Sequence, residues 1–235
     1  MTNSHDLLIL AVTRMRAGVC VAGMTAAPDP VSGLRWIRPV KRHSALLPGD
    51  IRYADGTLMR PGDVVRWQAA PLPAPPPHVE DALVDPVRDR PLLLRRRAAA
   101  ARAQFCATHL DRAPADVLCR QTRSLCLLRP ASARATWDRD PYSGRYEARM
   151  AFQSQEFSTD ERGLPVTDLA WRALGRDWLA GRARLELDDA ALHERIGPVC
   201  LAIGLGRAFE GRHWPLVIGV HAPGLPDVEI DESEL

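Results

Sequence analysis

One segment of this chain combines an indole with several positive charges. Between residues 35 and 42, Trp36 is surrounded by the basic side chains of Arg35, Arg38, Lys41 and Arg42. A surface that binds single-stranded nucleic acid needs cations for the backbone and aromatic faces for the bases, and each stacked base contributes about 1–3 kcal/mol. We therefore expect these five residues to form a nucleic-acid-binding surface.

The same residues also fit a structural role. Apolar and basic residues alternate over 34–40, which predicts a β-strand with Leu34 and Trp36 on one face. A tryptophan on such a strand often packs inward, so Trp36 is also a candidate core residue. Arg38 either points beyond the sheet edge or pairs inside the protein with Asp63 or Glu80. The sequence leaves both interpretations open.

A second group of basic residues is Arg95, Arg96 and Arg97. They lie in a stretch, 92–109, that is rich in Leu, Ala and Arg and has no glycine or internal proline, which predicts a helix. Arginine suits phosphate because its planar guanidinium donates two parallel hydrogen bonds. We expect these three arginines to assist nucleic-acid binding.

His78, Glu80 and Asp81 form a candidate polar site after a proline-rich stretch. An imidazole and two carboxylates can bind a divalent metal or act as an acid and base pair. Alternatively, the two acids begin a helix, where negative charge is stabilised by the helix dipole. A helical pattern over 79–84 favours the helix start, and we expect neither a resident metal nor another cofactor.

Motifs of well-known enzyme classes do not match this sequence. It contains no H-E-x-x-H, no G-x-S-x-G and no C-x-x-C pattern. Gly204-Leu205-Gly206 is not followed by the third glycine of a dinucleotide loop, because position 209 is Phe209. The five cysteines are odd in number, which argues against a disulfide framework and favours buried, reduced thiols. We therefore predict a non-catalytic protein.

The predicted elements are mostly short strands in two groups. The first group covers 7–12, 18–23, 34–40 and 64–68, and the second covers 124–128, 134–137, 146–152, 199–205 and 214–220. The stretch between them is predicted to be helical, and a short helix is expected after Asp168. The fold class is thus mainly β with a helical insert (α+β). The predicted organisation is a first β unit over 1–77, a helical connector over 78–120, a second β unit over 121–225 and an acidic tail over 226–235.

Length and charge set further limits. A chain of 235 residues can bury a large core, and its net charge is only +2. Basic side chains are in excess over 1–110, whereas the last ten residues are rich in acid and contain no base. We expect this tail to be solvated and able to contact a basic protein partner. No run of about 18 apolar residues and no signal-peptide pattern is present, so we expect a cytoplasmic protein without a membrane partner.

Five motifs in order resemble the dual OB-containing (DuOB) domain family of bacterial proteins. They are Gly18-Val19-Cys20-Val21-Ala22-Gly23, Trp36-Ile37-Arg38-Pro39-Val40, Asp63-Val64-Val65, His78-Val79-Glu80-Asp81 and Leu164-Pro165-Val166-Thr167-Asp168 with Trp171. The resemblance extends from about Leu7 to Val220. It implies two OB-like β-barrels packed together, recognition of nucleic acid or nucleotide, and association with bacterial genome-defence systems. The long proline tract and the arginine-rich insert depart from the family pattern.

The leading hypothesis from the sequence is therefore a nucleic-acid or nucleotide recognition module, acting as the sensor or adaptor of a bacterial conflict or defence system. Its expected ligand is single-stranded nucleic acid or a nucleotide. One alternative is a metal-dependent hydrolase that uses His78, Glu80 and Asp81. Another is an interaction scaffold that docks on a basic partner through its acidic tail.

Overall fold

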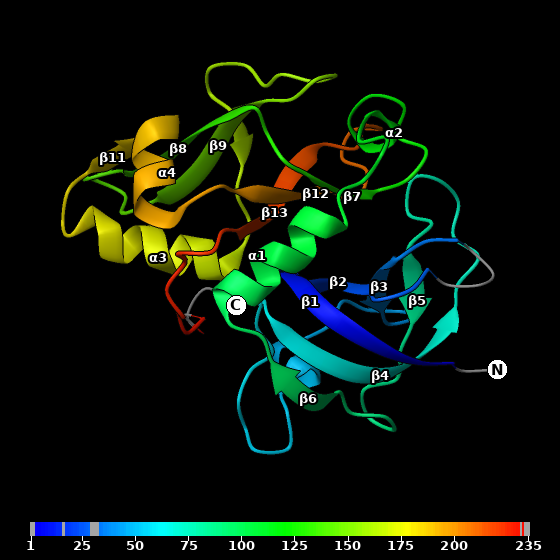
Figure 1. Ribbon diagram of the computed structural model, residues 1–235. Coiled ribbons are helices and arrows are strands. Elements are labelled where there is room, and N and C mark those ends of the chain that lie inside the picture. Colours follow the sequence, from blue (N-terminus) through cyan, green and yellow to red (C-terminus); the bar gives the residue numbers. More distant parts are fainter. Residues whose placement is uncertain (1–2, 16, 29–32, 231, 233–235) are drawn as a thin grey trace.

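The computed structural model describes residues 3–15, 17–28, 33–230 and 232 and shows a mainly β protein with some helices. Two groups of strands lie side by side, and the chain passes from one to the other through α1 (Ala99–Thr108) and α2 (Ala115–Leu118) (Figure 1). We call β1–β5 the N-terminal barrel and β7–β13 the C-terminal unit. In the described part of the chain, no helix has the length and apolar character needed to cross a membrane.

The N-terminal barrel is closed. It contains β1 (Asn3–Met15), β2 (Gly18–Thr25), β3 (Trp36–Val40), β4 (Asp63–Pro71) and β5 (Asp81–Leu83). β1 pairs antiparallel with both β2 and β4, β2 pairs with β3, β3 runs parallel to β5, and β5 pairs back with β4. This closure without a free edge is the architecture of a five-stranded OB barrel. A short 3₁₀ helix, η1 (Pro48–Ile51), follows β3, and β6 (Leu92–Arg96) adds to β4 from outside the ring.

Alternating side chains fill this barrel. Along β4, Val65, Trp67 and Ala69 are buried in the barrel core, whereas Arg66 is exposed between them. Strands with one buried face show this period of two because successive side chains point to opposite faces. The strand expected over 64–68 is therefore present, with its apolar residues inside.

The C-terminal unit contains two sheets. One has the order β10-β9-β8-β11 and the other β13-β12-β7. Their bounds are β7 (Leu125–Leu128), β8 (Ser132–Arg139), β9 (Tyr146–Gln153), β10 (Leu164–Pro165), β11 (Arg184–Leu187), β12 (Cys200–Leu205) and β13 (Pro215–His221). Helices α3 (Leu169–Leu179) and α4 (Asp189–Ile196) connect β10, β11 and β12. As expected, Asp168 caps α3, because its carboxylate accepts hydrogen bonds from the backbone N–H groups of Ala170 and Trp171.

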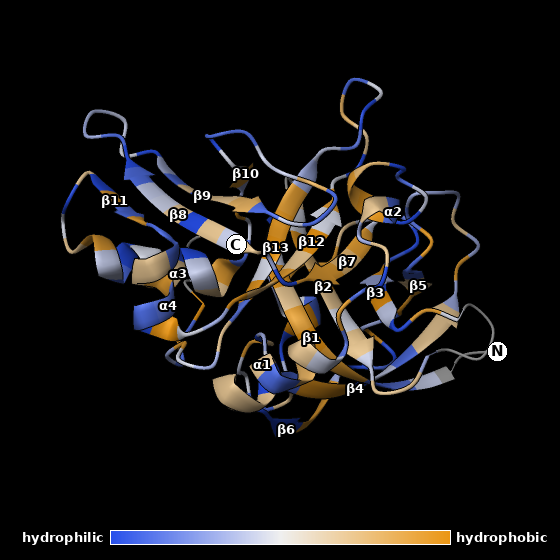
Figure 2. Cartoon of the chain, turned by 45° about the horizontal axis from the view of Figure 1, so that its top comes forward, coloured by the Kyte–Doolittle hydropathy of each residue, from blue (hydrophilic) through white to orange (hydrophobic). Residues whose placement is uncertain are grey.

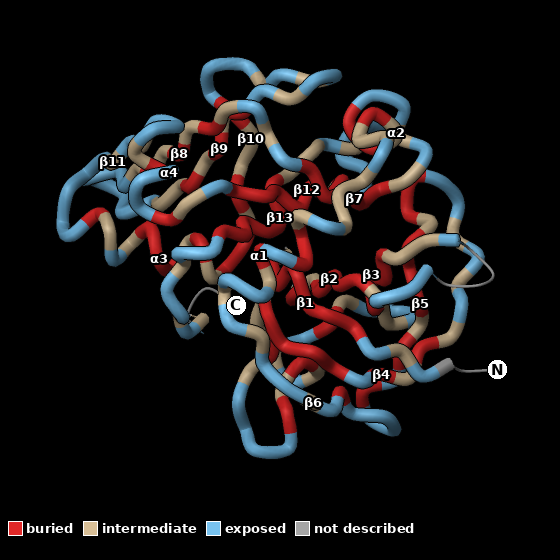
Figure 3. Tube along the Cα trace, in the orientation of Figure 1, coloured by how far each residue is buried: buried red, intermediate tan, exposed pale blue. Residues whose placement is uncertain are grey.

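The two parts share a hydrophobic core. One buried cluster joins β1, β2 and β4 of the N-terminal barrel to β7, β12, β13 and α1, with Leu10, Leu127 and Ile218 among its members. Hydrophobic residues gather where these strands meet (Figure 2), and the buried trace is continuous across the junction (Figure 3). β12 is buried on both faces, since one face packs on its own unit and the other on this junction. The two parts therefore pack as one body.

The segment between the two strand groups differs from the prediction. The expected helical pattern over 79–84 is instead β5, the strand that completes the N-terminal barrel, and it lies beyond residue 77, where we expected the first β unit to end. Residues 92–96 are also a strand, and α1 begins only at Ala99. Both segments pair with β4, and this tertiary pairing overrides the local helix propensity.

The acidic tail is only partly solvated. Asp227 and Glu232 are exposed, but their carboxylates pair with Arg60 and Arg52 at 3.0 and 2.7 Å. Between them, the half-buried Ile230 packs against the core of the N-terminal barrel. Asp231 and Glu234 lie outside the described residues. The described part of the tail thus contacts its own chain.

Gly219 of β13 lies close to β1 of the N-terminal barrel. A Cβ at this position would lie 2.3 Å from the backbone oxygen of Leu10 in β1, so the strands would have to separate. We predict that Gly219→Ala lowers the free energy of unfolding by about 1–3 kcal/mol, measured by urea denaturation. Gly49→Ala is the control because nothing lies within 4 Å of its added Cβ. Equal stability of the two variants would contradict this close packing.

Candidate functional site

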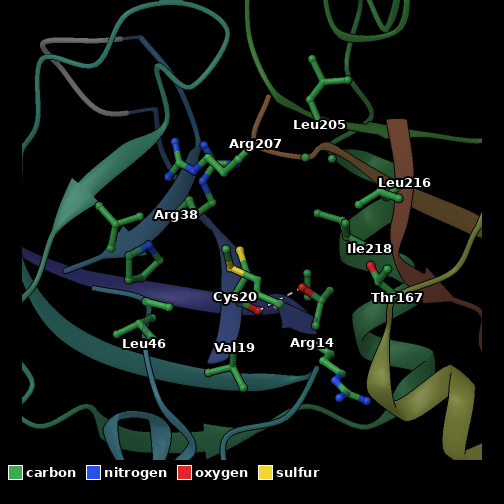
Figure 4. Close-up of a pocket in the computed structure, with 18 of the residues that line it drawn as sticks. Arg14, Val19, Cys20, Arg38, Leu46, Thr167, Leu205, Arg207, Leu216 and Ile218 are labelled. Atoms are coloured by element: carbon green, nitrogen blue, oxygen red, sulfur yellow. Dashed lines mark hydrogen bonds between the residues drawn. The ribbon is translucent and has the colours of Figure 1, made fainter. Parts of the chain in front are cut away.

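A pocket of about 300 Å³ opens between the N-terminal barrel and the C-terminal unit. We call it the junction pocket. One side comes from β1, β2, β3 and the loop after β3, and the other from β7, β12, β13 and the residues after β12 (Figure 4). β2 and β3 supply the face that OB folds commonly use for oligonucleotides. The pocket therefore lies where the barrel's usual binding face meets a second wall.

The basic end of the pocket is built around one carboxylate. Asp81, buried at the start of β5, accepts a hydrogen bond from Nε of Arg38 at 2.5 Å and another from Nη2 of Arg207 at 2.8 Å. Arg38 is buried, whereas the Arg207 side chain is half exposed. Two guanidinium charges thus share one negative charge. The group retains one net positive charge beside the pocket.

His78 does not neutralise this excess. Its Nδ1 accepts a hydrogen bond from Nη2 of Arg38 at 2.7 Å, and its ring meets the edge of His213 at 5.0 Å between centroids. Burial, together with the positive charges of Arg38 and Arg207, lowers the pKa of His78 to about 3. The imidazole is therefore neutral at physiological pH and acts as an acceptor.

The walls of the pocket are mostly apolar. Leu205, Leu216 and Ile218 face Val19 and Leu46 across it (Figure 4). Arg14 lies at the opposite end from Arg38 and Arg207 (Figure 4). Burial raises the pKa of the Cys20 thiol, which favours its neutral form. None of the described residues that line the pocket is acidic. Apolar walls with cations at both ends suit an anion that carries a flat, apolar group.

The structure separates the five residues of the predicted 35–42 surface. Arg38 and Lys41 line the junction pocket, and Lys41 also pairs with Asp50 at 2.6 Å. Arg42 is exposed outside the pocket lining, and Arg35 donates to the backbone oxygen of Ala26.

Trp36 has a structural position. It is 3% exposed in the core between the two parts, and its indole N–H donates to Asp111 at 3.3 Å. Its ring faces are covered, so stacking on a base would require this core to open. We therefore correct the expectation and leave Trp36 out of the site.

The predicted contribution of Arg95, Arg96 and Arg97 is not part of this pocket. Arg95 and Arg96 lie in β6, outside the barrel, and Arg97 follows it; the Arg96 guanidinium pairs with Asp63 at 3.0 Å. The Arg97 guanidinium lies over the Phe105 ring, 5.7 Å from its centroid. None of the three is among the residues that line the junction pocket.

The candidate polar site is divided, because Glu80 has partners other than Arg38, which Asp81 and His78 share. Glu80 accepts hydrogen bonds from the backbone N–H groups of Ser124 and Leu125 and from the Ser124 hydroxyl, at 2.7–3.2 Å. Asp81 binds two arginines and His78 binds one. Residues 81–83 form a strand, so the expected helix start is wrong. Among the described residues, no group of three His, Cys, Asp or Glu side chains is placed to bind a metal.

Sequence reasoning missed the contribution of the C-terminal unit. Arg207 follows the Gly204-Leu205-Gly206 segment, whose sequence indicates only an incomplete dinucleotide loop. It reaches Asp81 across a separation of 126 residues. A basic residue directly after a Gly-x-Gly strand end was the available signal, but the sequence does not show which carboxylate it meets.

His78 makes stability depend on pH. Its ordinary pKa of about 6.5 applies to the unfolded chain, so between pH 6.5 and 3 the unfolded state binds a proton that the folded state does not. Stability therefore falls as the pH is lowered through this window. We predict that His78→Asn, which keeps an acceptor for Arg38 but does not titrate, loses less stability than the wild type between pH 7 and pH 5. Urea midpoints at each pH measure this.

Other buried groups titrate in both proteins, so the comparison isolates position 78. His221, for example, has a pKa well below its ordinary value because it is buried and lies near Arg102. If the free energy of unfolding falls equally with pH in the wild type and in His78→Asn, the pKa of His78 is not lowered by folding and the prediction is wrong.

Comparison with known proteins agrees with the geometry. The family model described as "Dual OB-containing domain" matches residues 5–220. Neither a curated protein nor a solved structure is similar enough to match. The family match covers most of the chain and includes both sides of the junction pocket. The resemblance expected from the sequence is confirmed, and the protein belongs to the dual OB-containing domain family.

Proposed function

We propose that this protein recognises single-stranded nucleic acid or a nucleotide in the junction pocket. The observation that carries the proposal is the shared carboxylate of Asp81, which leaves Arg38 and Arg207 with an excess positive charge beside an apolar slot. A phosphate would bind the guanidiniums, and a base would fit between the apolar walls. Family membership supports the proposal, since OB-fold modules often bind nucleic acid.

Recognition fits the pocket better than catalysis. Its described lining residues include no carboxylate and no histidine that could transfer a proton to a ligand. His78, which contacts the lining residue Arg38, is neutral, and its Nδ1 accepts a hydrogen bond from that arginine. We further propose, from the family resemblance, that the module serves a bacterial defence system as its nucleic-acid sensor or adaptor.

We also infer that the C-terminal unit is a second OB barrel. Its strands repeat the order of pairing in the N-terminal barrel when β7 and β8 are taken as one bent first strand. That strand pairs with β9 and β12, β9 with β10, and β12 with β13. A single parallel bridge between Val166 and Val217 corresponds to the parallel contact of β3 with β5. The two barrels would then be packed against each other around the junction pocket.

The interaction scaffold remains a second proposal for the tail. Its Asp227 and Glu232 already pair with Arg60 and Arg52 of the same chain, so a basic partner would have to displace these contacts. Co-purification of a partner by the full chain, and its loss on deletion of 226–235 with nucleic-acid binding intact, would support the scaffold.

Fluorescence anisotropy with labelled 12-nucleotide DNA and RNA strands, and competition by mononucleotides, tests the proposed binding. We predict binding that weakens with salt, and about tenfold weaker binding by Arg207→Ala, because a charge-assisted hydrogen bond contributes about 1.5–3 kcal/mol. The side chain is half exposed, so the variant should fold.

Arg88→Ala is the matched control. It removes the same charge from an exposed loop, and Arg88 does not line the junction pocket. Absence of binding to every probe at low salt, or equal loss of affinity in both variants, would overturn the proposed site.

A further inference from the structure

A second basic depression lies on the C-terminal unit. It has a volume of about 390 Å³, and we call it the arginine groove. Its lining residues are Arg14, Arg139, Gly144, Arg145, Tyr146, Arg172, Arg176, Leu179, Gly181 and Arg182. Six of the described lining residues are arginines and none is acidic. These residues come from the end of β1, the β8–β9 turn with the strand ends beside it, α3 and the segment after α3.

Several of these arginines are held in place by aromatic and backbone contacts. The guanidiniums of Arg172 and Arg176 lie over the Tyr146 ring, at 4.9 and 4.6 Å from its centroid. The Tyr146 hydroxyl donates to the backbone oxygen of Arg172 at 2.8 Å. Arg182 donates to the backbone oxygens of Trp178 and Leu179 near the end of α3. These contacts hold the guanidiniums in place along the groove.

The carboxylates around the groove do not cancel its charge. Glu147 pairs with Arg145 at 2.7 Å and also lies 4.0 Å from Arg149 and 3.7 Å from Arg162, which are outside the groove lining. Asp177 lies on α3, and its negative charge is close enough to raise the pKa of Tyr146. Asp140, in the β8–β9 turn, also lies near Arg145. These carboxylates are fewer than the six lining arginines, so the groove keeps a positive excess. Such a surface attracts a polyanion more than a single phosphate.

Arg14 connects this groove to the junction pocket, because it lines both. It is exposed at the end of β1, next to the turn into β2. The cations of the two sites therefore continue from Arg38 and Arg207, past Arg14, to Arg139 and Arg145. A strand of several nucleotides could contact the cations of both sites, whereas a single nucleotide in the junction pocket would leave the arginine groove empty. The continuous row of cations therefore favours a strand as the ligand.

We propose that the ligand is a single strand of several nucleotides, with one nucleotide in the junction pocket and the adjoining phosphodiester backbone in the arginine groove. This inference rests on the proposed function and narrows its ligand from nucleotide or strand to strand. Its sequence preference would reside in the pocket, because arginine contacts to phosphates carry no base information.

The double variant Arg139→Ala/Arg145→Ala tests the inference. Both side chains are exposed, so the fold should persist, which thermal unfolding checks. The matched control is Arg88→Ala/Arg90→Ala, which removes the same charge from an exposed loop of the N-terminal barrel. Affinities for thymidine oligomers of 1, 3, 6 and 12 nucleotides, and for the RNA equivalents, are measured over a range of salt concentrations.

We expect affinity to rise with strand length in the wild type. The groove variant should bind the 12-nucleotide strand at least tenfold more weakly, with a salt dependence reduced by about 1.4 in log–log slope, as expected for two lost phosphate contacts. Its affinity for the mononucleotide should stay within about twofold of the wild type. In the control variant, the affinities for the 12-nucleotide strand and for the mononucleotide should both stay within about twofold of the wild type.

The outcomes separate the two proposals. Equal binding of mononucleotide and 12-nucleotide strand, or a groove variant that behaves as the control does, overturns the inference while the junction pocket stands. Tighter binding of poly-glutamate than of the strands, lost in the groove variant, identifies an acidic protein as the groove's ligand and also overturns it. Absence of binding to every nucleotide and strand overturns both.

Discussion

Two adjacent buried carboxylates hold the molecule together at its functional junction. Glu80 accepts hydrogen bonds from Ser124 and Leu125 at the start of β7, and Asp81 binds Arg207 after β12. The side chains of these two neighbouring residues therefore both contact the C-terminal unit. Burying two neighbouring negative charges is unfavourable unless each is satisfied by donors. Here the donors come from both parts of the chain. The relative position of the two parts, and hence the junction pocket, depends on this arrangement.

The same constraint determines the charge of the site. Glu80 is satisfied by backbone N–H groups and a hydroxyl, which carry no charge, so it offsets no arginine directly. Asp81 is the carboxylate hydrogen-bonded to both Arg38 and Arg207. His78, kept neutral by burial and by those arginines, adds nothing to either side. The contacts that join the two parts thus also produce a positive centre next to an apolar slot, and the proposed nucleotide binding rests on this combination.

The sequence predicted several strands well because they are apolar or β-branched runs bounded by turns, or because they alternate, as 146–152 does. The segments over 18–23, 64–68 and 146–152 form strands as expected, and the cap at Asp168 starts α3. β5 was missed because three residues are too few to show a period of two, and its acids resemble a helix start. β6 was missed because its leucines and arginines favour helix, whereas pairing with β4 decides the outcome.

The candidate site was only partly predictable. Arg38 and Lys41 were identified from their local charge, and burial of Arg38 beside a carboxylate was one of the alternatives, although its partner is Asp81 instead of Asp63 or Glu80. Arg207 and the arginine groove were not identified, because their residues are scattered from Arg14 to Arg207 and become neighbours only through strand pairing. Trp36 gave a misleading signal, since exposed and buried tryptophans show the same alternation.

Photo-cross-linking tests the central claim most directly. A strand that carries 4-thiothymidine or 4-thiouridine is bound at low salt and irradiated, and the attached peptides are mapped by mass spectrometry. The account predicts cross-links within residues 13–20, 38–46 and 204–218, on both sides of the junction pocket. Cross-links confined to β6 and its neighbours, or cross-links that persist unchanged when the protein is unfolded, would contradict it.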